Sequence, residues 1–120
     1  MSFRPASIAA IAAVTAPLLL LASGAEAHAH LVMAAPSANA TVAAPSAVRL
    51  RFSERLAPRF SGADLMQSDG QAVASRAKVS GKAVQLSPTT RLAPGGYMVM
   101  WHVVSSDGHK MKGQYNFTVR

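Results

Sequence analysis

The chain has 120 residues, no cysteine, and a formal net charge of +7 from 12 basic and five acidic residues. This length allows one domain with a modest core, and the absence of thiols excludes disulfides and thiolate metal sites. The basic residues are scattered along the chain. We therefore interpret the charge as a solvated surface with some attraction to anionic membranes, and we expect no nucleic-acid partner.

Residues 1–27 have the organisation of a secretory signal peptide. A basic start at Arg4 is followed by a long uncharged stretch and by small residues up to Ala27. The strongly apolar part is short and contains Pro17, which argues against a retained membrane span of about 20 residues. Cleavage after Ala27 would place 28–120 in the periplasm as a single domain.

The rest of the chain has the pattern of short strands separated by turns. The predicted strands are 31–33, 47–53, 63–67, one strand within 71–79, 83–86, 97–104 and 112–120. The predicted connections are the loop 34–45, the irregular segment 54–62, the turns 68–70 and 80–82, the connection 88–96 and the turn at 107–108.

These elements predict an all-β sandwich of about seven strands, because no segment shows sustained helical periodicity. The segment 47–53 alternates most clearly, with Val48, Leu50 and Phe52 on one face. Trp101 lies in the strongest predicted strand, and we expect it at the centre of the core.

Two clusters carry candidate metal ligands. After cleavage, His28 would offer an α-amine and an imidazole to one metal ion, and His30 follows closely. In the second cluster, Gly108 allows a sharp bend so that Asp107 and His109 can face one point. Amine and imidazole nitrogens lose their protons to a metal near neutral pH. Three nitrogens and one carboxylate oxygen form a donor set that suits Cu(II).

Other interpretations of these residues stay open. Asp-Gly-His is also an ordinary turn sequence. A free His28-Ala29-His30 terminus could bind Cu(II) through its amine, two backbone amides and the His30 ring, without any fold. Met98, Met100 and His102 alternate on the face opposite Trp101, where they could fill gaps between side chains or bind Cu(I).

Several segments carry a family resemblance. They are 28–31 (His-Ala-His-Leu), 50–54 (Leu-Arg-Phe-Ser-Glu), 92–97 (Leu-Ala-Pro-Gly-Gly-Tyr), 101–109 (Trp-His-Val-Val-Ser-Ser-Asp-Gly-His) and 113–119 (Gly-Gln-Tyr-Asn-Phe-Thr-Val). Together they resemble the periplasmic copper-resistance protein CopC family over essentially all of 28–120. The resemblance implies an Ig-like Greek-key β-sandwich that carries or buffers copper in copper homeostasis and is not an enzyme.

The resemblance also implies a ligand set and a partner. One Cu(II) per chain would be held by His28, Asp107 and His109, with His30 assisting and Glu54 close enough to orient a ligand. The implied partner is a CopD-type inner-membrane copper protein, and we expect a monomer. Some members of the family bind Cu(I) in a Met-rich loop, but the corresponding region 55–66 has one Met and no His, so we expect no such site there.

Two alternative functions differ in class. An N-terminal His with a second His resembles the histidine brace of copper monooxygenases, although Asp107 would occupy a position that oxygen chemistry needs open. The second alternative is a plain Ig-like module in which copper binding is confined to the N-terminal His-Ala-His.

Overall fold

The computed structural model describes residues 30–120, which form nine strands and one short 3₁₀ helix. The elements are β1 (Leu31–Ala35), β2 (Thr41–Val42), β3 (Val48–Phe52), η2 (Pro58–Phe60), β4 (Gly62–Gln67), β5 (Ala72–Val73), β6 (Ser75–Ser80), β7 (Ala83–Pro88), β8 (Gly95–Val104) and β9 (Lys110–Val119). The predicted signal peptide, 1–27, and His28 lie outside the described residues.

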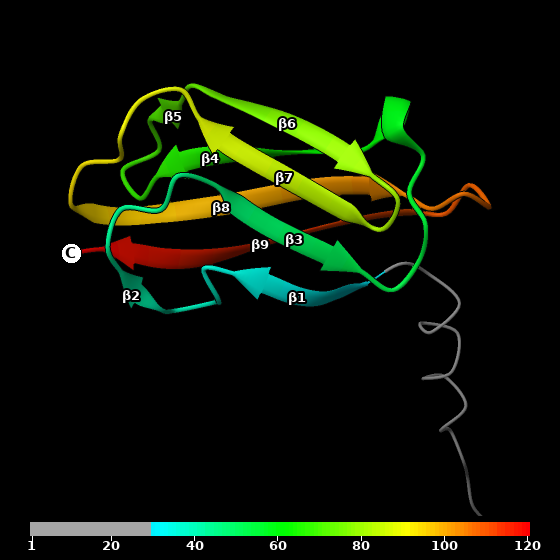
Figure 1. The fold of residues 1–120 in the computed structure, drawn as a ribbon, viewed down its shortest axis with the longest axis horizontal. Helices are drawn as coiled ribbons and strands as arrows, with labels where there is room; N and C mark the ends of the chain where they lie inside the picture. Colours follow the sequence, from blue (N-terminus) through cyan, green and yellow to red (C-terminus); the bar gives the residue numbers. More distant parts are fainter. Residues whose placement is uncertain (1–29) are drawn as a thin grey trace, which may run out of the picture.

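Two sheets stack face to face (Figure 1). One has the strand order β1-β3-β7-β6, and the other has the order β2-β9-β8-β4-β5. The chain changes sheet several times, and among the described strands only β2 and β9 pair in parallel. The prediction of an Ig-like Greek-key β-sandwich is confirmed, and seven of the described strands have five residues or more. In residues 30–120, no helix has the length and apolar character needed to cross a membrane.

The core lies between the sheets and follows the period-2 pattern of the sequence. In β3, Val48, Leu50 and Phe52 are at most 1% exposed, whereas Arg49 and Arg51 between them are exposed. Successive side chains of a strand point to opposite faces, so this alternation fixes which face of β3 packs inward. The prediction for this strand is confirmed.

Trp101 does not lie at the centre of the core, so that prediction is wrong. It is partly buried and packs against the rim of the core, with its ring centroid 6.1 Å from Phe52 and 6.2 Å from Tyr115. Opposite Trp101 in the β8–β9 pair is Gly113, and a Cβ at Gly113 would stand 2.3 Å from the indole ring. The indole ring therefore covers the backbone of Gly113. The fully buried aromatic side chains of the core are instead Phe52 and Phe117.

Two short strands were absent from the prediction. The expected loop 34–45 contains β2, and the segment 71–79 contains two strands, β5 and β6, which belong to different sheets. A two-residue strand shows no alternation along the sequence, because it is defined by its pairing with a neighbour.

Candidate metal centre

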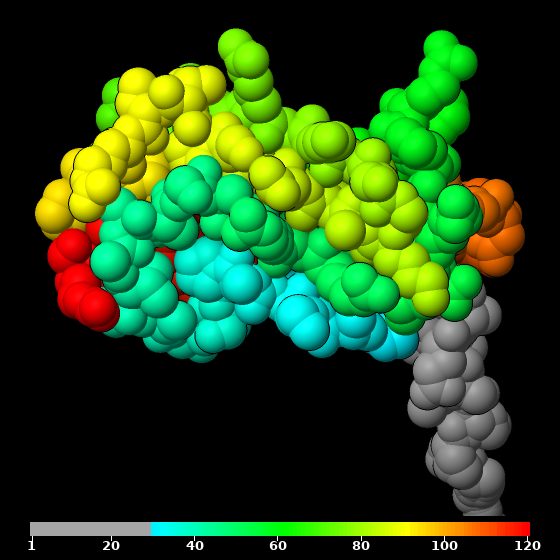
Figure 2. All heavy atoms as spheres, in the orientation of Figure 1, coloured from blue at the N-terminus to red at the C-terminus, as the bar shows by residue number. Residues whose placement is uncertain are grey.

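The candidate ligands that the structure describes lie at one end of the sandwich. Figure 1 shows the start of β1, the end of β3, η2 and the β8–β9 turn together at this end. His30 immediately precedes β1, and Asp107 and His109 belong to the turn. Figure 2 shows the turn at the surface, so ions in solution can reach it.

The β8–β9 turn is closed by Ser105 and His109. The Ser105 N–H donates to the His109 carbonyl at 2.9 Å, and the Gly108 N–H donates to the Ser105 carbonyl at 2.8 Å. Gly108 has a φ of +93°, as expected where a three-residue hairpin turn ends in the left-handed region. This geometry brings the side chains on either side of Gly108 together.

Asp107 and His109 form a close pair. The His109 Nδ1 lies 3.1 Å from Asp107 Oδ1, and their side chains are 60% (Asp107) and 46% (His109) exposed. The Ser105 hydroxyl donates to the same Oδ1. The hydrogen bonds from Ser105 and His109 lower the pKa of Asp107, because they favour the charged carboxylate. The bond from Ser105 has the larger effect. The pair thus presents an ionised carboxylate, with its second oxygen Oδ2, beside an imidazole.

A short segment after β3 connects His30 to this turn. Ser53 accepts the His30 N–H at 3.0 Å, lies 3.2 Å from His30 Nδ1, and donates its own N–H to the His30 carbonyl at 2.9 Å. Two residues later, the Arg55 carbonyl accepts both the N–H of Ser106 at 2.9 Å and its hydroxyl at 3.1 Å. Leu56 forms a β-bridge with Ser105. The start of β1 and the turn are therefore fixed to the same few residues of chain.

The predicted ligands thus fall into three groups. Asp107 and His109 are brought together, and His30 is tied to the neighbouring segment that also contains the exposed Glu54. His28 lies outside the described residues. Within 30–120, no three His, Asp or Glu side chains gather closely enough to hold a metal ion by themselves. The Asp107–His109 pair supplies a carboxylate oxygen and an imidazole nitrogen as donors, so the predicted donor set also needs His28.

Two serines that hold the candidate ligands in place were not predicted from the sequence. Ser105 is 3% exposed, and its Oγ also accepts the His109 N–H at 3.2 Å. Ser53 plays the corresponding role for His30. A signal was present, because a serine shortly before an Asp-Gly turn commonly bonds to nearby backbone and side-chain groups.

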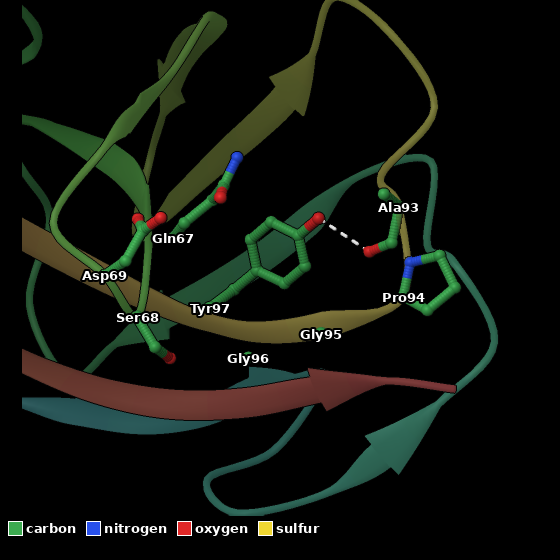
Figure 3. A pocket seen from close by; sticks show the side chains of 8 residues that line it. All are labelled: Gln67, Ser68, Asp69, Ala93, Pro94, Gly95, Gly96 and Tyr97. Atoms are coloured by element: carbon green, nitrogen blue, oxygen red, sulfur yellow. Dashed lines mark hydrogen bonds between the residues drawn. The ribbon is translucent and has the colours of Figure 1, made fainter.

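A pocket at the opposite end of the sandwich has a different character. It is lined by Gln67, Ser68, Asp69, Ala93, Pro94, Gly95, Gly96 and Tyr97 (Figure 3). The Tyr97 hydroxyl donates to the Ala93 carbonyl at 2.6 Å, which satisfies a polar group of a largely buried ring. With one carboxylate and no imidazole in its lining, this pocket offers no set of metal ligands.

Comparisons with known proteins agree with this architecture. The solved structures that match include PcoC, described as a methionine-rich copper resistance protein from Escherichia coli, and CopC from Methylosinus trichosporium OB3b. PcoC has a TM-score of 0.73 and 37% identity, covering 78% of this chain and 99% of PcoC. CopC has a TM-score of 0.72 and 41% identity, covering 77% of this chain and 93% of CopC.

Several sequence relatives match over most of both chains. Copper resistance protein C from Xanthomonas campestris pv. juglandis is 40% identical over 110 residues, covering 84% of this chain and 87% of that protein. Protein YobA from Escherichia coli K12 is 44% identical over 99 residues, covering 78% and 80% respectively. The CopC domain profile matches residues 31–120, which are all but one of the residues that the structure describes. The chain therefore belongs to the CopC domain family.

Proposed function

We propose that this protein binds one Cu(II) ion in the periplasm and acts as a carrier or buffer in copper resistance. The ligands are the amine and ring of His28, with Asp107 and His109. The observation that carries the proposal is the Asp107–His109 pair, in which an ionised carboxylate and an imidazole lie 3.1 Å apart on an accessible turn. Nitrogen and oxygen donors of this kind suit Cu(II).

The position of His30 supports a contribution from His28. His30 is hydrogen-bonded to Ser53, and the turn is hydrogen-bonded to Arg55, only two residues further along. His28 precedes His30 by two residues, and two residues of chain span at most about 7 Å. A terminus created by cleavage after Ala27 would therefore begin close to the turn.

A carrier role fits these residues better than an oxidative enzyme. The Asp107 carboxylate lies beside the His109 ring. In a copper monooxygenase, oxygen needs an open position on the metal, which this carboxylate would fill. Homologues named copper resistance protein C point in the same direction. We further propose a CopD-type inner-membrane protein as the exchange partner, because a periplasmic carrier needs a membrane protein with which to exchange its ion.

The test is electron paramagnetic resonance of the Cu(II) complex of the exported protein, after mass spectrometry has identified its first residue. We expect one Cu(II) per chain, with nitrogen couplings that change in His28→Ala and in His109→Ala. Each change should weaken binding by at least about 100-fold, the upper end of the loss caused by residues that only orient ligands. His102→Ala is the matched control, because His102 is exposed on β8, outside the turn.

The same experiment separates the alternatives. If His109→Ala leaves the spectrum and the affinity unchanged, copper is bound by the N-terminal His-Ala-His alone and the proposed site is wrong. Copper-dependent and reductant-dependent oxidation of a polysaccharide would contradict the carrier role.

A further inference from the structure

The outer face of the five-stranded sheet carries an unusual group of methionines. Met98 and Met100 of β8 point away from the core, because Val99 and Trp101, which alternate with them along the strand, face it. The structure adds Met66 of β4, which pairs directly with Met98. Three of the chain's six methionines are thus neighbours on one partly exposed surface.

The spacing of these residues allows their sulfur atoms to meet. Side chains directly opposite in an antiparallel pair have Cβ atoms about 4.5–5.5 Å apart, and diagonal neighbours are about 7–8 Å apart, within reach of long side chains. Met66 is opposite Met98 and diagonal to Met100. Each methionine extends its sulfur on a flexible unbranched chain, so the three thioethers can converge on one ion.

The usual packing role of methionine does not account for this group. An antiparallel sheet in a sandwich normally has polar residues on its solvated face. The neighbouring strand β9 follows this rule, since the partners of Met98, Met100 and His102 are Asn116, Gln114 and Lys112. On the same face of β8 and β4, methionine stands where a polar residue is expected, and it does not fill the core. Departures of this kind from the local pattern are typical of functional positions.

We propose that Met66, Met98 and Met100 form a Cu(I) site on this face, separate from the Cu(II) site. Thioethers are soft, uncharged ligands that select Cu(I) over hard divalent ions. Asp64 lies opposite Met100 and is exposed, so one negative charge stands beside the place for a monovalent cation. This site does not depend on His28, Asp107 or His109.

Met66 takes the place of His102 in the ligand set that the sequence suggested. His102 is four residues from Met98, which corresponds to about 13 Å along a strand. Its ring packs over Gly62, where a Cβ would lie 3.2 Å from Cε1 and 3.3 Å from Nε2. His102 therefore lies too far from Met98 to share one ion with both Met66 and Met98.

The test uses protein labelled with ¹³C at the methionine methyl groups, titrated with Ag(I) in chloride-free buffer and with Cu(I) under anaerobic conditions. We expect the methyl signals of Met66, Met98 and Met100 to shift together and to saturate at one equivalent. Met33, which is 62% exposed on β1, should not shift and serves as an internal control. Equal shifts at Met33, or no saturation at one equivalent, would show unspecific thioether binding and overturn the proposal.

Variants provide an independent measurement by competition with a chromophoric Cu(I) chelator. Met98→Leu combined with Met100→Leu keeps the side-chain volume and should lower the Cu(I) affinity at least tenfold, whereas Met33→Leu should leave it unchanged. An unchanged Cu(I) affinity in the double variant would refute the site. The Cu(II) resonance spectrum of the double variant should match that of the unmodified protein, so this site and the Cu(II) site succeed or fail separately.

Discussion

Ser105 is a small buried residue that fixes the positions of two exposed residues, Asp107 and His109. It holds the Asp107 carboxylate through its hydroxyl and closes the turn at His109 through its backbone. The sequence Ser-Ser-Asp-Gly-His indicates that a serine contacts the turn, but it does not say which one, because Ser106 is an equal candidate. The structure distinguishes them: the Ser106 hydroxyl donates to the Arg55 carbonyl instead.

Removing the Ser105 hydroxyl should raise the pKa of Asp107. The hydrogen bond from Ser105 is the largest cause of the lowered pKa, so Ser105→Ala should move the titration of the Asp107 carboxyl toward its ordinary value. Carboxyl chemical shifts measured by NMR in the metal-free protein would report this change. Ser106→Ala is the control and should leave the titration where it is.

The lowered pKa also gives the direction of a pH effect on stability. Because the pKa of Asp107 is lower in the folded protein, its ionised form stabilises the fold above the unfolded pKa. This contribution is lost as pH falls through the lowered pKa. In Asp107→Asn it should be missing at every pH, which urea unfolding along a pH series would detect as a smaller loss of stability in acid.

Copper affinity should depend on pH in a higher range. The α-amine and the imidazoles must lose their protons to bind a metal, and their ordinary pKa values are about 7.7–8.0 and 6.5. We therefore expect the apparent Cu(II) affinity to fall steeply below about pH 6. Competition titrations at several pH values measure it, and an affinity that stays flat down to pH 4 would contradict the proposed nitrogen ligands.

At the scale of elements, the sequence predicted strands well where alternation was sustained. β3 shows this, with Val48, Leu50 and Phe52 buried as its alternation predicts. Prediction failed where tertiary pairing decides the outcome. The two-residue strand β2 exists because Thr41 and Val42 pair with β9, and Trp101 sits at the rim because its cross-strand partner is glycine. The methionine site could not be predicted in full for the same reason. Met66 is a neighbour of Met98 only because of the register between β4 and β8, which the sequence does not reveal.

The Trp101–Gly113 contact predicts the effect of a side chain at position 113. A Cβ there would lie within 2.3–2.9 Å of three atoms of the indole ring, so Gly113→Ala must displace the ring from Phe52 and Tyr115. We expect a loss of about 1–3 kcal/mol in the free energy of unfolding, as for other overpacked sites. Urea unfolding measures it, with the exposed neighbour Gln114→Ala as a control that should change stability by less than about 0.5 kcal/mol.

At the scale of the whole molecule, the core and the candidate metal centre are separate. The chain has no cysteine and so no disulfide, and the fold is stabilised by apolar burial between the two sheets. The candidate ligands that the structure describes belong to the β8–β9 turn and to the segments beside it, at one end of this core (Figure 1). The copper-free protein should therefore be folded.

A core substitution can test this separation. Leu86 is fully buried in β7, and Leu86→Ala should lower the free energy of unfolding by about 2–5 kcal/mol. The Cu(II) resonance spectrum of this variant should nevertheless be unchanged. Saturating Cu(II) at about 100 times its dissociation constant should stabilise both proteins by about 2.7 kcal/mol through mass action. A spectrum altered by Leu86→Ala would mean that the site depends on the packing of the core.

The partly buried Trp101 has a consequence for following the metal optically. It is the only tryptophan of the chain, and it lies in β8 four residues before Ser105, which directly follows this strand; four residues of strand span about 13 Å. Its fluorescence therefore comes from one known place between the two proposed copper positions. Paramagnetic Cu(II) bound at the turn would quench this emission, whereas closed-shell Cu(I) bound on the methionine face would quench it far less, so the emission of Trp101 should report which of the two proposed sites is filled.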